Sequence, residues 1–505
     1  MSRTALLPLD VTKEIRGLSG AWLACLVALV VPAVLGVRAL SGLDLPAYVL
    51  GAAALGALSI GHEYSHCTLT LLLSHPARRE RLFLVKLGVL AAMLLALYGV
   101  AVAVDVRAPE SQRLPFFLLL PMLCGLFVAP WFTMLCRSPL AGTVLAIALP
   151  PWLLLLSELV YVAMYGRGPG ADVEAAIMWR GALGLSAVGA VMSWRMFMRL
   201  EAIDDGGPEV QLPQWLRPRT TVSSAASALT RRHPVWRLVK KEIWLQKTAL
   251  AVAALYMLGC LAFVSINPWL ALGSSVPDGG DILAVLTFSY SVLISVLIGS
   301  LASAEERQLG TLDWQVLLPL ATRKQWIVKV GTVFGLALLL ALALPGLLLA
   351  AITPAADMAL LLGRAPQFAV GVAVLTVIGL YVSSLCTSGV QALLISVPAI
   401  FALVLPVTMV AEWLQPYGLV MAMATRRSAE KAWVSVGISP IDRSRLMSLL
   451  ELLLVAAILA VALRFALANH RSAYPLGGRA WTQVILMAIF LTVGALLLGG
   501  MVALA

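Results

Sequence analysis

Two stretches of the chain, 63-EYSHCTLTLLLSHPARRERLFLVK-86 and 306-ERQLGTLDWQVLLPLATRKQWIVK-329, present the same types of residue in the same order. Each starts at a glutamate, passes through Thr-Leu, a leucine-rich run, a proline and a group of basic residues, and ends at a lysine. The offset between the copies is 243 positions at the glutamates (63 and 306), the prolines (76 and 319) and the lysines (86 and 329). Because this offset is constant, we conclude that the chain contains a parallel internal repeat.

The repeat extends upstream of these stretches. Lys13-Glu14-Ile15 recurs as Lys241-Glu242-Ile243, at an offset of 228 positions. A longer first external loop in the second copy, 265-SINPWLALGSSVPDGGD-281, accounts for the difference between the two offsets. Each copy therefore has a basic leading segment, two apolar spans, a Glu…Lys segment and further spans, as expected of a pseudo-symmetric transporter.

The composition is that of a membrane protein. Hydrophobic residues make up 61% of the 505 positions and charged residues only 12%, whereas a soluble domain is about half apolar and a quarter charged. We interpret the net charge of +11 through the positive-inside rule and attraction to anionic membrane lipid, and we expect no nucleic-acid partner. The six cysteines have no Cys-x-x-Cys spacing, so they predict neither a disulfide framework nor a zinc framework.

Apolar runs long enough to cross a bilayer recur along the whole chain. Counting them places the main basic clusters on one side, which the rule assigns to the cytoplasm together with the N-terminus. Residues 411–445 carry arginines although the count places them outside, so either that segment holds interfacial or re-entrant helices or the count is off by one there. The expected spans are 20–40, 45–62, 83–104, 114–136, 138–163, 173–197, 249–268, 282–303, 326–352, 366–387, 389–410, 446–468 and 481–504.

A polar segment divides the chain. Residues 204–234, DDGGPEVQLPQWLRPRTTVSSAASALTRRHP, are rich in Pro, Gly, Ser and charge, which is typical of a linker. We expect a first transmembrane half at 1–203, this cytoplasmic linker, a second half at 235–470 and an additional C-terminal transmembrane segment at 471–505.

The first copy also contains a zinc-protease signature. His62-Glu63-Tyr64-Ser65-His66 reads H-E-x-x-H, which on a helix places both imidazoles on one face. A third ligand is still required, and the Asp-Gly at Asp278 that superficially offers one lies by the span count a membrane thickness from His62. The second copy replaces the histidines by Glu305 and Leu309. We expect neither a metal site nor a catalytic residue, and keep an intramembrane zinc metalloprotease as the alternative.

The repeated motif resembles that of the membrane subunits of ABC-2 type ABC transporters. The second copy is the closer match because Gly310 precedes Thr311, whereas the first copy has Cys67 at that place. The resemblance implies an all-α integral membrane fold with two pseudo-symmetric six-helix ABC-2 (type V exporter-like) halves and an extra C-terminal span. It also implies a multi-pass protein of the bacterial inner membrane.

In this family the segment between the second and third spans is a coupling helix that docks into an ATP-hydrolysing partner. The resemblance thus implies two copies of a separate ABC ATPase, which bind ATP and Mg. This chain lacks a G-x-x-x-x-G-K-[ST] loop, so we expect no enzymatic activity and no cofactor of its own. Individual arginines in the set are open to another reading, as ordinary positive-inside anchors. The residues that the resemblance assigns to coupling are Glu63, Thr68, Leu69, Pro76, Arg78, Arg79, Glu306, Gly310, Thr311, Leu312, Pro319, Arg323 and Lys324.

The leading segments, 12-TKEIRGLSGAW-22 and 236-WRLVKKEIWLQK-247, are similar to the amphipathic elbow helices of the family. They are equally compatible with the charged starts of ordinary spans.

Polar residues within spans are candidates for a gate or a pathway. Glu158 follows Pro150-Pro151 and Glu412 follows Pro406 at a similar distance, which suits a re-entrant turn near the outer face. Ser289 and Tyr290 are further pathway candidates. Both acids could instead cap that turn in water, and small polar residues also serve as helix contacts in membranes.

We therefore expect an ATP-driven exporter of a hydrophobic or amphipathic substrate, such as a drug, lipid or peptide. The zinc protease is one competitor. A secondary transporter driven by an ion gradient is another, but it calls for buried acid–base pairs at mid-membrane, and the spans are nearly free of charge.

Overall fold

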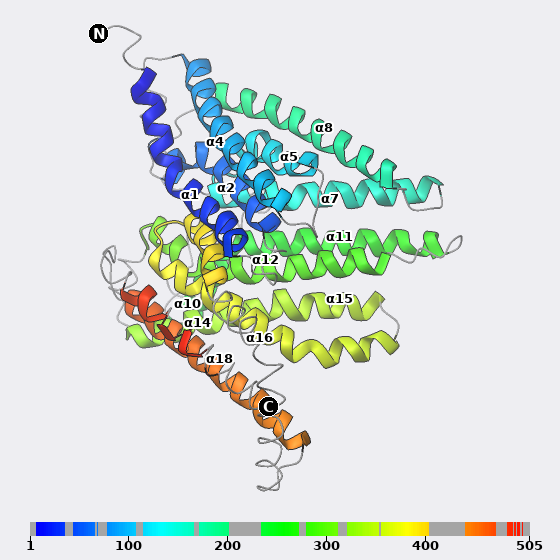
Figure 1. Cartoon of the computed structure of the whole chain (residues 1–505), viewed down its shortest axis with the longest axis vertical. Helices are drawn as coiled ribbons and strands as arrows, with labels where there is room; N and C mark the ends of the chain where they lie inside the picture. The colour runs from blue at the N-terminus through cyan, green and yellow to red at the C-terminus, as the bar shows by residue number, and fades with distance from the viewer. Residues whose placement is uncertain are drawn as a thin grey trace, which may run out of the picture.

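The computed structural model describes residues 7–35, 44–65, 68, 78–107, 115–165, 171–200, 234–271, 279–311, 321–352, 355–402, 440–470 and most of 482–497. All regular structure within these ranges is helical and no strand occurs in them (Figure 1). The expected all-α class is confirmed for this part of the chain.

The helices follow the order of the apolar runs. The first copy of the repeat comprises α1 (Leu7–Leu35), α2 (Asp44–Ser65), α4 (Arg79–Arg107), α5 (Pro115–Leu123), the π-helix η2 (Cys124–Val128), α6 (Ala129–Cys136), α7 (Pro139–Tyr165) and α8 (Ala171–Met198). The second comprises α10 (Pro234–Leu245), α11 (Lys247–Ala271), α12 (Gly279–Gln308), α14 (Thr322–Leu338), the π-helix η4 (Leu339–Ala343), α15 (Leu344–Ile352), α16 (Ala355–Leu385), a short helix at Gly389–Ala402 and α18 (Pro440–His470).

The described helices identify a multi-pass membrane protein. Nine of them are long and apolar enough to cross a bilayer, and the bent pair α10–α11 makes a tenth. Three shorter apolar helices, Pro139–Pro150, Gly389–Ala402 and Thr482–Gly494, overlap the remaining expected spans. Every apolar run expected from the sequence thus overlaps an apolar helix of the described residues.

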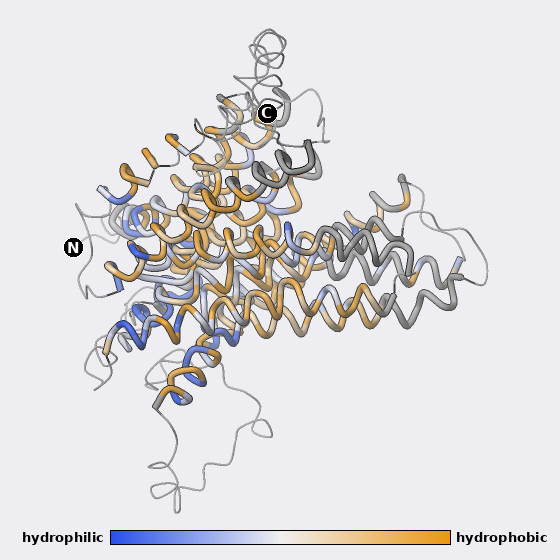
Figure 2. The backbone as a smooth tube through the Cα atoms, turned by 90° about the horizontal axis from the view of Figure 1, so that it is seen from below, coloured by the Kyte–Doolittle hydropathy of each residue, from blue (hydrophilic) through white to orange (hydrophobic). Residues whose placement is uncertain are grey.

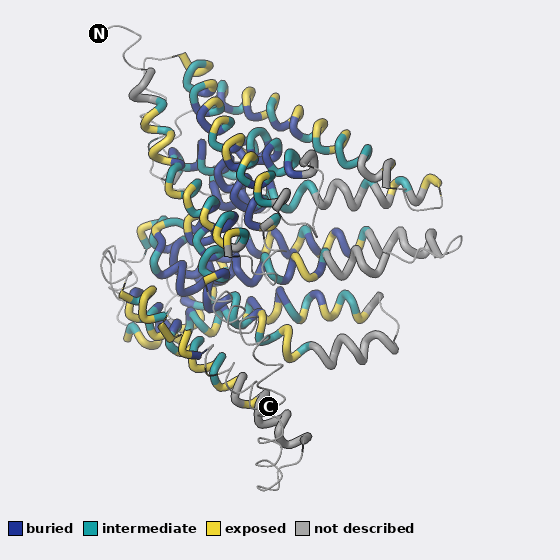
Figure 3. Tube along the Cα trace, in the orientation of Figure 1, coloured by how far each residue is buried: buried dark blue, intermediate teal, exposed yellow. Residues whose placement is uncertain are grey.

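Two helices form the centre of the molecule. Most of the apolar stretch of α2, and likewise of α12, is buried inside the protein, whereas less than a third of that stretch is buried in α1, α4, α8, α14 and α18 (Figure 3). α2 packs against η2, α6 and α7, and α12 packs along α16. Since the exposed faces of the outer helices are apolar, they suit a lipid environment.

The two leading segments fold differently. The first is the beginning of α1, which runs without a break from Leu7 to Leu35 and starts well before the expected span at 20–40. The second is a separate helix, α10, at 60° to α11. At the break, the side chain of Gln246 donates a hydrogen bond to the backbone oxygen of Ile298 on α12 (3.1 Å). Only the second segment therefore forms a separate helix that is bent away from the next one, and the first is the charged start of a continuous helix.

Glycines set the closest helix contacts. A Cβ on Gly56 of α2 would collide with the carbonyl oxygen of Gly125 in η2. A Cβ on Gly299 of α12 would lie 2.9 Å from the backbone nitrogen of Leu380 and 3.0 Å from the Cα of Gly379 on α16. Gly56 and Gly299 are again 243 positions apart, so the repeat preserves this close approach of the second helix to the fourth.

Both π-helices lie immediately before a helix that carries proline at its second position. In η4, the amide of Leu344 bonds to the oxygen of Leu339, and the next amide in that pattern would belong to Pro345, which has no N–H. The oxygen of Leu340 instead accepts a hydrogen bond from the hydroxyl of Tyr290 (3.0 Å). A side chain of α12 thus supplies the donor that the proline removes.

Candidate functional site: two matching ion-pair clusters

The first charge cluster joins the ends of α1, α2 and α4. Lys13 Nζ lies 3.3 Å from Glu63 Oε1, and Lys86 Nζ lies 3.2 Å from the same oxygen. Lys86 Nζ also lies 2.7 Å from Glu14 Oε1. The hydroxyl of Thr68 donates a hydrogen bond to the other oxygen of Glu63. One glutamate thereby holds three helices together.

The second charge cluster does the same for α10, α12 and α14. Lys241 Nζ lies 2.6 Å from Glu306 Oε1, and Lys329 Nζ lies 2.7 Å from Glu306 Oε2. Lys329 Nζ also lies 3.3 Å from Glu242 Oε2.

The two clusters match residue by residue. In both, the leading Lys-Glu pair, the glutamate that ends the second helix and the lysine of the next helix make the same ion pairs. The match includes a backbone contact, because Lys86 Nζ donates to the oxygen of Ser59 (3.3 Å) and Lys329 Nζ to that of Ala302 (2.7 Å), 243 positions apart. The repeat in the sequence is therefore also a repeat of contacts in space.

These charges are buried. The side chains of Glu63 and Lys86 are 2% and 4% exposed, and those of Glu306 and Lys329 are fully buried. A buried charge is tolerated only when it is paired, and removing one partner leaves the other charge buried and uncompensated. The clusters therefore fix the relative positions of three helices at the end where hydrophilic residues gather (Figure 2).

The expectation that the spans are nearly free of charge needs a correction. Glu63, Glu306 and Lys329 lie within the helical segments Leu45–Tyr64, Leu286–Gln308 and Thr322–Ala350, which are apolar enough to span a membrane. Glu63 and Glu306 lie in the last turn of their segments, and Lys329 is the eighth residue of its own. Each charge has a partner of opposite sign on a neighbouring helix.

The two threonines of the motif lie beside the clusters. Thr311 Oγ1 donates to the backbone oxygen of Glu306 (3.3 Å), and Thr68 bonds to Glu63 as described above. Gly310 follows α12 with φ of 64°, and its amide donates to the oxygen of Arg307 (3.1 Å). This left-handed conformation explains why the position is a glycine, because a residue without a Cβ can end the helix in this way without a steric clash.

The basic residues of the motif are exposed. Arg78 and Arg79 lie at the start of α4, and Arg323 and Lys324 at the start of α14. Arg79 is also occupied within the chain, since its Nη1 donates to the backbone oxygens of Met198 (2.8 Å) and Leu200 (3.0 Å) at the end of α8.

Several predicted positions lie outside the described residues or have no described side chain. These are Leu69, Pro76, Leu312, Pro319, Glu412 and the side chain of Glu158, together with the linker and residues 411–439 of the anomalous segment.

The two remaining pathway candidates differ in exposure. Ser289 is exposed, whereas Tyr290 is buried, with its ring stacked on that of Tyr256 at a centroid distance of 3.9 Å and an angle of 5°.

The glutamate of the zinc-protease signature takes part in ion pairs, whereas the protease chemistry requires it as a general base. Glu63, which would be the general base, is paired with two lysines, and Glu306 makes the same pairs in a copy without the histidines. His62 lies in α2, while His66 and Asp278 fall outside the described residues. Within the described ranges, no group of three His, Cys, Asp or Glu side chains is placed to hold a metal ion.

The partners of the two glutamates were not predicted. The signal was present, since the Lys-Glu pairs at 13–14 and 241–242 and the lysines at 86 and 329 are the charges that the repeat retains. The sequence contains a further repeat, since Leu135-Cys136-x-Ser138 recurs as Leu385-Cys386-x-Ser388. In both copies a new helix begins at this serine. The hydroxyl oxygen of Ser138 accepts a hydrogen bond from the amide of Ala141 (3.4 Å), and that of Ser388 accepts one from the amide of Gln391 (3.3 Å).

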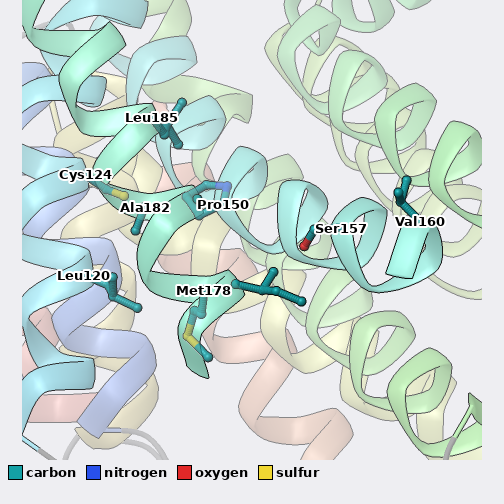
Figure 4. A pocket seen from close by; sticks show the side chains of 10 residues that line it. Leu120, Cys124, Pro150, Ser157, Val160, Met178, Ala182 and Leu185 are labelled. Carbon is teal, nitrogen blue, oxygen red and sulfur yellow. The ribbon is translucent and has the colours of Figure 1, made fainter. Parts of the chain in front are cut away.

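A cavity of about 420 Å³ opens between α5, η2, α7 and α8 (Figure 4). Its walls are apolar apart from the hydroxyl of Ser157 and the thiol of Cys124, so it suits a hydrocarbon group better than a polar one. The lining residues are Leu120, Cys124, Pro150, Ser157, Val160, Ile177, Met178, Gly181, Ala182 and Leu185.

Comparisons with known proteins returned no matching family model, no matching curated protein and no matching solved structure.

Proposed function

We propose that this chain is the membrane permease of an ATP-driven ABC-2 type transporter, which exports a hydrophobic or amphipathic substrate. It would comprise two six-helix halves and an additional C-terminal span in a bacterial inner membrane, with a cytoplasmic N-terminus. The observation that supports the proposal is the duplicated charge cluster, because in both copies it lies at the end of the second helix, where the resemblance would have a coupling segment begin.

The clusters suit a mechanical connection. Each coupling segment would begin directly after Glu63 or Glu306, and each glutamate is tied to the first and third helices of its copy. A displacement of the segment would therefore move three helices together, since buried ion pairs cannot separate without stranding a charge. In this mechanism the glutamates transmit force within the chain, and exposed residues such as Arg323 and Lys324 contact the ATPase.

Contacts between the two copies support a complete pathway in one chain. The fifth span of the first copy, α7, packs against α11, the first span of the second copy. Reciprocally, Phe401 in the fifth span of the second copy packs with Ala28 of α1 and Ala47 of α2. A pseudo-twofold pair of halves would make such reciprocal contacts.

The partner is tested by purification from native membranes. We expect an ABC ATPase at two copies per chain, which supplies the ATP and Mg site, and one copy after Arg323→Glu with Lys324→Glu. Arg180→Glu, an exposed arginine in the first turns of α8, is the control and should retain both copies. A chain that purifies without any ATPase contradicts the proposal.

The buried ion pairs favour a second candidate, transport driven by an ion gradient. The purified chain in liposomes, without ATPase, separates the two. Transport that follows an imposed proton or sodium gradient and is abolished by Glu306→Gln would support the second candidate and contradict the first.

The substrate class is tested at the apolar cavity. Gly181 lines it, and a Cβ there would meet nothing within 4 Å, so Gly181→Trp should fill the space. We expect export of a hydrophobic substrate to fall by about tenfold, the scale set by exclusion from an apolar pocket. Gly184→Trp, on the same helix with equally open surroundings but outside the cavity, should leave export unchanged. An equal fall in export in both variants would show that the substrate does not pass through this cavity.

A further inference from the structure

The second charge cluster continues into the C-terminal part of the chain through a polar network. Arg307, next to Glu306, donates from Nη2 to the backbone oxygen of Asn469 at the end of α18 (3.2 Å). The side-chain nitrogen of Asn469 donates to the hydroxyl of Ser384 on α16 (3.0 Å) and to the amide oxygen of Gln483 (3.0 Å). Gln483 returns a hydrogen bond from its nitrogen to Asn469 Oδ1 (2.8 Å).

Burial makes this network a strong constraint. Asn469 is fully buried, and its paired amide satisfies both donor and acceptor on each side, so loss of Gln483 would leave polar atoms without their partner. The neighbouring His470 lies against Trp326 of α14, with ring centroids 5.3 Å apart. Gln483 belongs to the helix Thr482–Gly494, in the C-terminal segment that the repeat does not account for.

The first charge cluster is continued by apolar contacts instead. Tyr64 occupies the position that corresponds to Arg307, and it packs with Phe83 and Phe197 in an apolar group. Phe83 corresponds to Trp326, and its ring lies 5.0 Å from that of Phe197 at the end of α8. The ends of α8 and α18 therefore lie at the same place in the repeat. The end of α8 accepts hydrogen bonds from Arg79 of α4, whereas the end of α18 is hydrogen-bonded to a helix that lies outside the repeat.

We propose that Asn469 is a positioning residue, which ties the second charge cluster to the helix Thr482–Gly494. The two clusters are consequently not equivalent in the part of the chain that the structure describes, because the C-terminal helix holds the end of α12 in place and no described helix follows α8 in the first copy. The functional consequence rests on the proposed function: of the two ATPase sites, the one after α12 is preorganised and binds its ATPase more tightly.

The structural part is tested without a partner, by hydrogen exchange on the full chain in lipid nanodiscs. In Asn469→Ala and in Gln483→Ala we expect backbone amides of residues 305–311 to exchange about tenfold faster, as for the loss of about two neutral hydrogen bonds. Amides of residues 62–65 should be unchanged. Ile485→Ala, a truncation on the same helix at a side chain that is 55% exposed, should change neither set.

A swap of the two amides distinguishes positioning from general stabilisation. Asn469→Gln with Gln483→Asn keeps the total length of the pair and should restore slow exchange at residues 305–311, whereas each single change should not. Equal acceleration at both clusters in the alanine variants, or none at either, would overturn the proposal.

The functional part uses binding of the purified ATPase to the same variants. Gln483→Ala should weaken the tighter of two sites by about tenfold and leave the weaker site unchanged. Two equal sites in the unaltered chain would overturn the claim of non-equivalence. If no ATPase binds at all, the proposed function fails, while the exchange experiment still decides the role of Asn469.

Discussion

The lysines of the two clusters differ greatly in exposure, and this difference predicts how much each contributes to stability. Lys329 is fully buried between Glu242 and Glu306, whereas the side chain of Lys13 is 62% exposed beside Glu63. Solvent screens the ion pair of the exposed Lys13, but it does not screen the ion pairs of the buried Lys329.

We expect Lys329→Met to destabilise the protein by about 3–5 kcal/mol, because Glu242 and Glu306 both lose their fully buried cation and only the partly exposed Lys241 remains paired with Glu306. Lys13→Met should cost less than about 1 kcal/mol, because Lys86 still neutralises Glu63. Thermal unfolding of the purified chain in detergent measures both. Equal losses in the two variants would show that the clusters do not depend on burial.

The hydroxyl of Tyr290 is a second single-residue feature with a measurable role. Tyr290→Phe should cost about 1–3 kcal/mol, because the oxygen of Leu340 then loses the donor that replaces the missing amide of Pro345. In a Pro345→Ala background the backbone can supply that donor, so the same change should cost clearly less. Unfolding of the two single variants and the double variant gives this coupling, and purely additive losses would contradict it.

At the scale of helices, the two central elements depend on glycine. α2 meets η2 at Gly56, and α12 meets α16 at Gly299, with no space for a methyl group at either contact. Neither contact is visible in the apolar pattern, since glycines are also frequent in lipid-facing positions of membrane helices.

We expect Gly56→Ala and Gly299→Ala to destabilise by about 1–3 kcal/mol or to prevent folding, because the helices must separate. The controls are Gly88→Ala and Gly331→Ala, which are likewise 243 positions apart and have nothing within 4 Å of the added Cβ. They should be neutral or stabilising by up to about 1 kcal/mol, through better helix propensity. Apparent melting temperatures in detergent rank the four variants, and a loss in the controls as large as at Gly56 would refute the contact.

At the scale of the whole molecule, the two copies of the repeat share one apolar core. Buried residues of α1, α2 and α4 belong to the same cluster as those of α11, α12 and α16. The covalent linker at 204–234 is therefore not what holds the copies together.

Expressed as two chains divided within 204–234, the copies should assemble and purify together at equal amounts. Affinity purification through a tag on one chain measures this. Phe401→Asp in the divided protein should release the partner chain, because Phe401 is buried against Ala28 and Ala47. Separate purification of the unaltered chains would contradict a shared core.

Much of the architecture could be predicted from the sequence. Hydropathy located every apolar helix, because crossing a bilayer depends on the local composition of one segment. The constant offset marked the residues that form the clusters, because both copies must retain the same contacts. What the sequence did not predict is which charges meet: Lys86 pairs with Glu14, 72 residues earlier, as well as with the glutamate of its own motif.

The sequence by itself determined the membrane class, the apolar helices and the register of the repeat, since these are properties of short segments and of their order. Only the tertiary structure decided that α1 is continuous while α10 bends away from α11, although both leading segments carry the same Lys-Glu-Ile. The break lies where Gln246 reaches the backbone of α12, a contact over 52 residues that no local pattern encodes. The tertiary structure likewise joined Asn469 to Gln483 and Arg307, because burial and hydrogen bonding depend on distances between residues that the chain order leaves far apart.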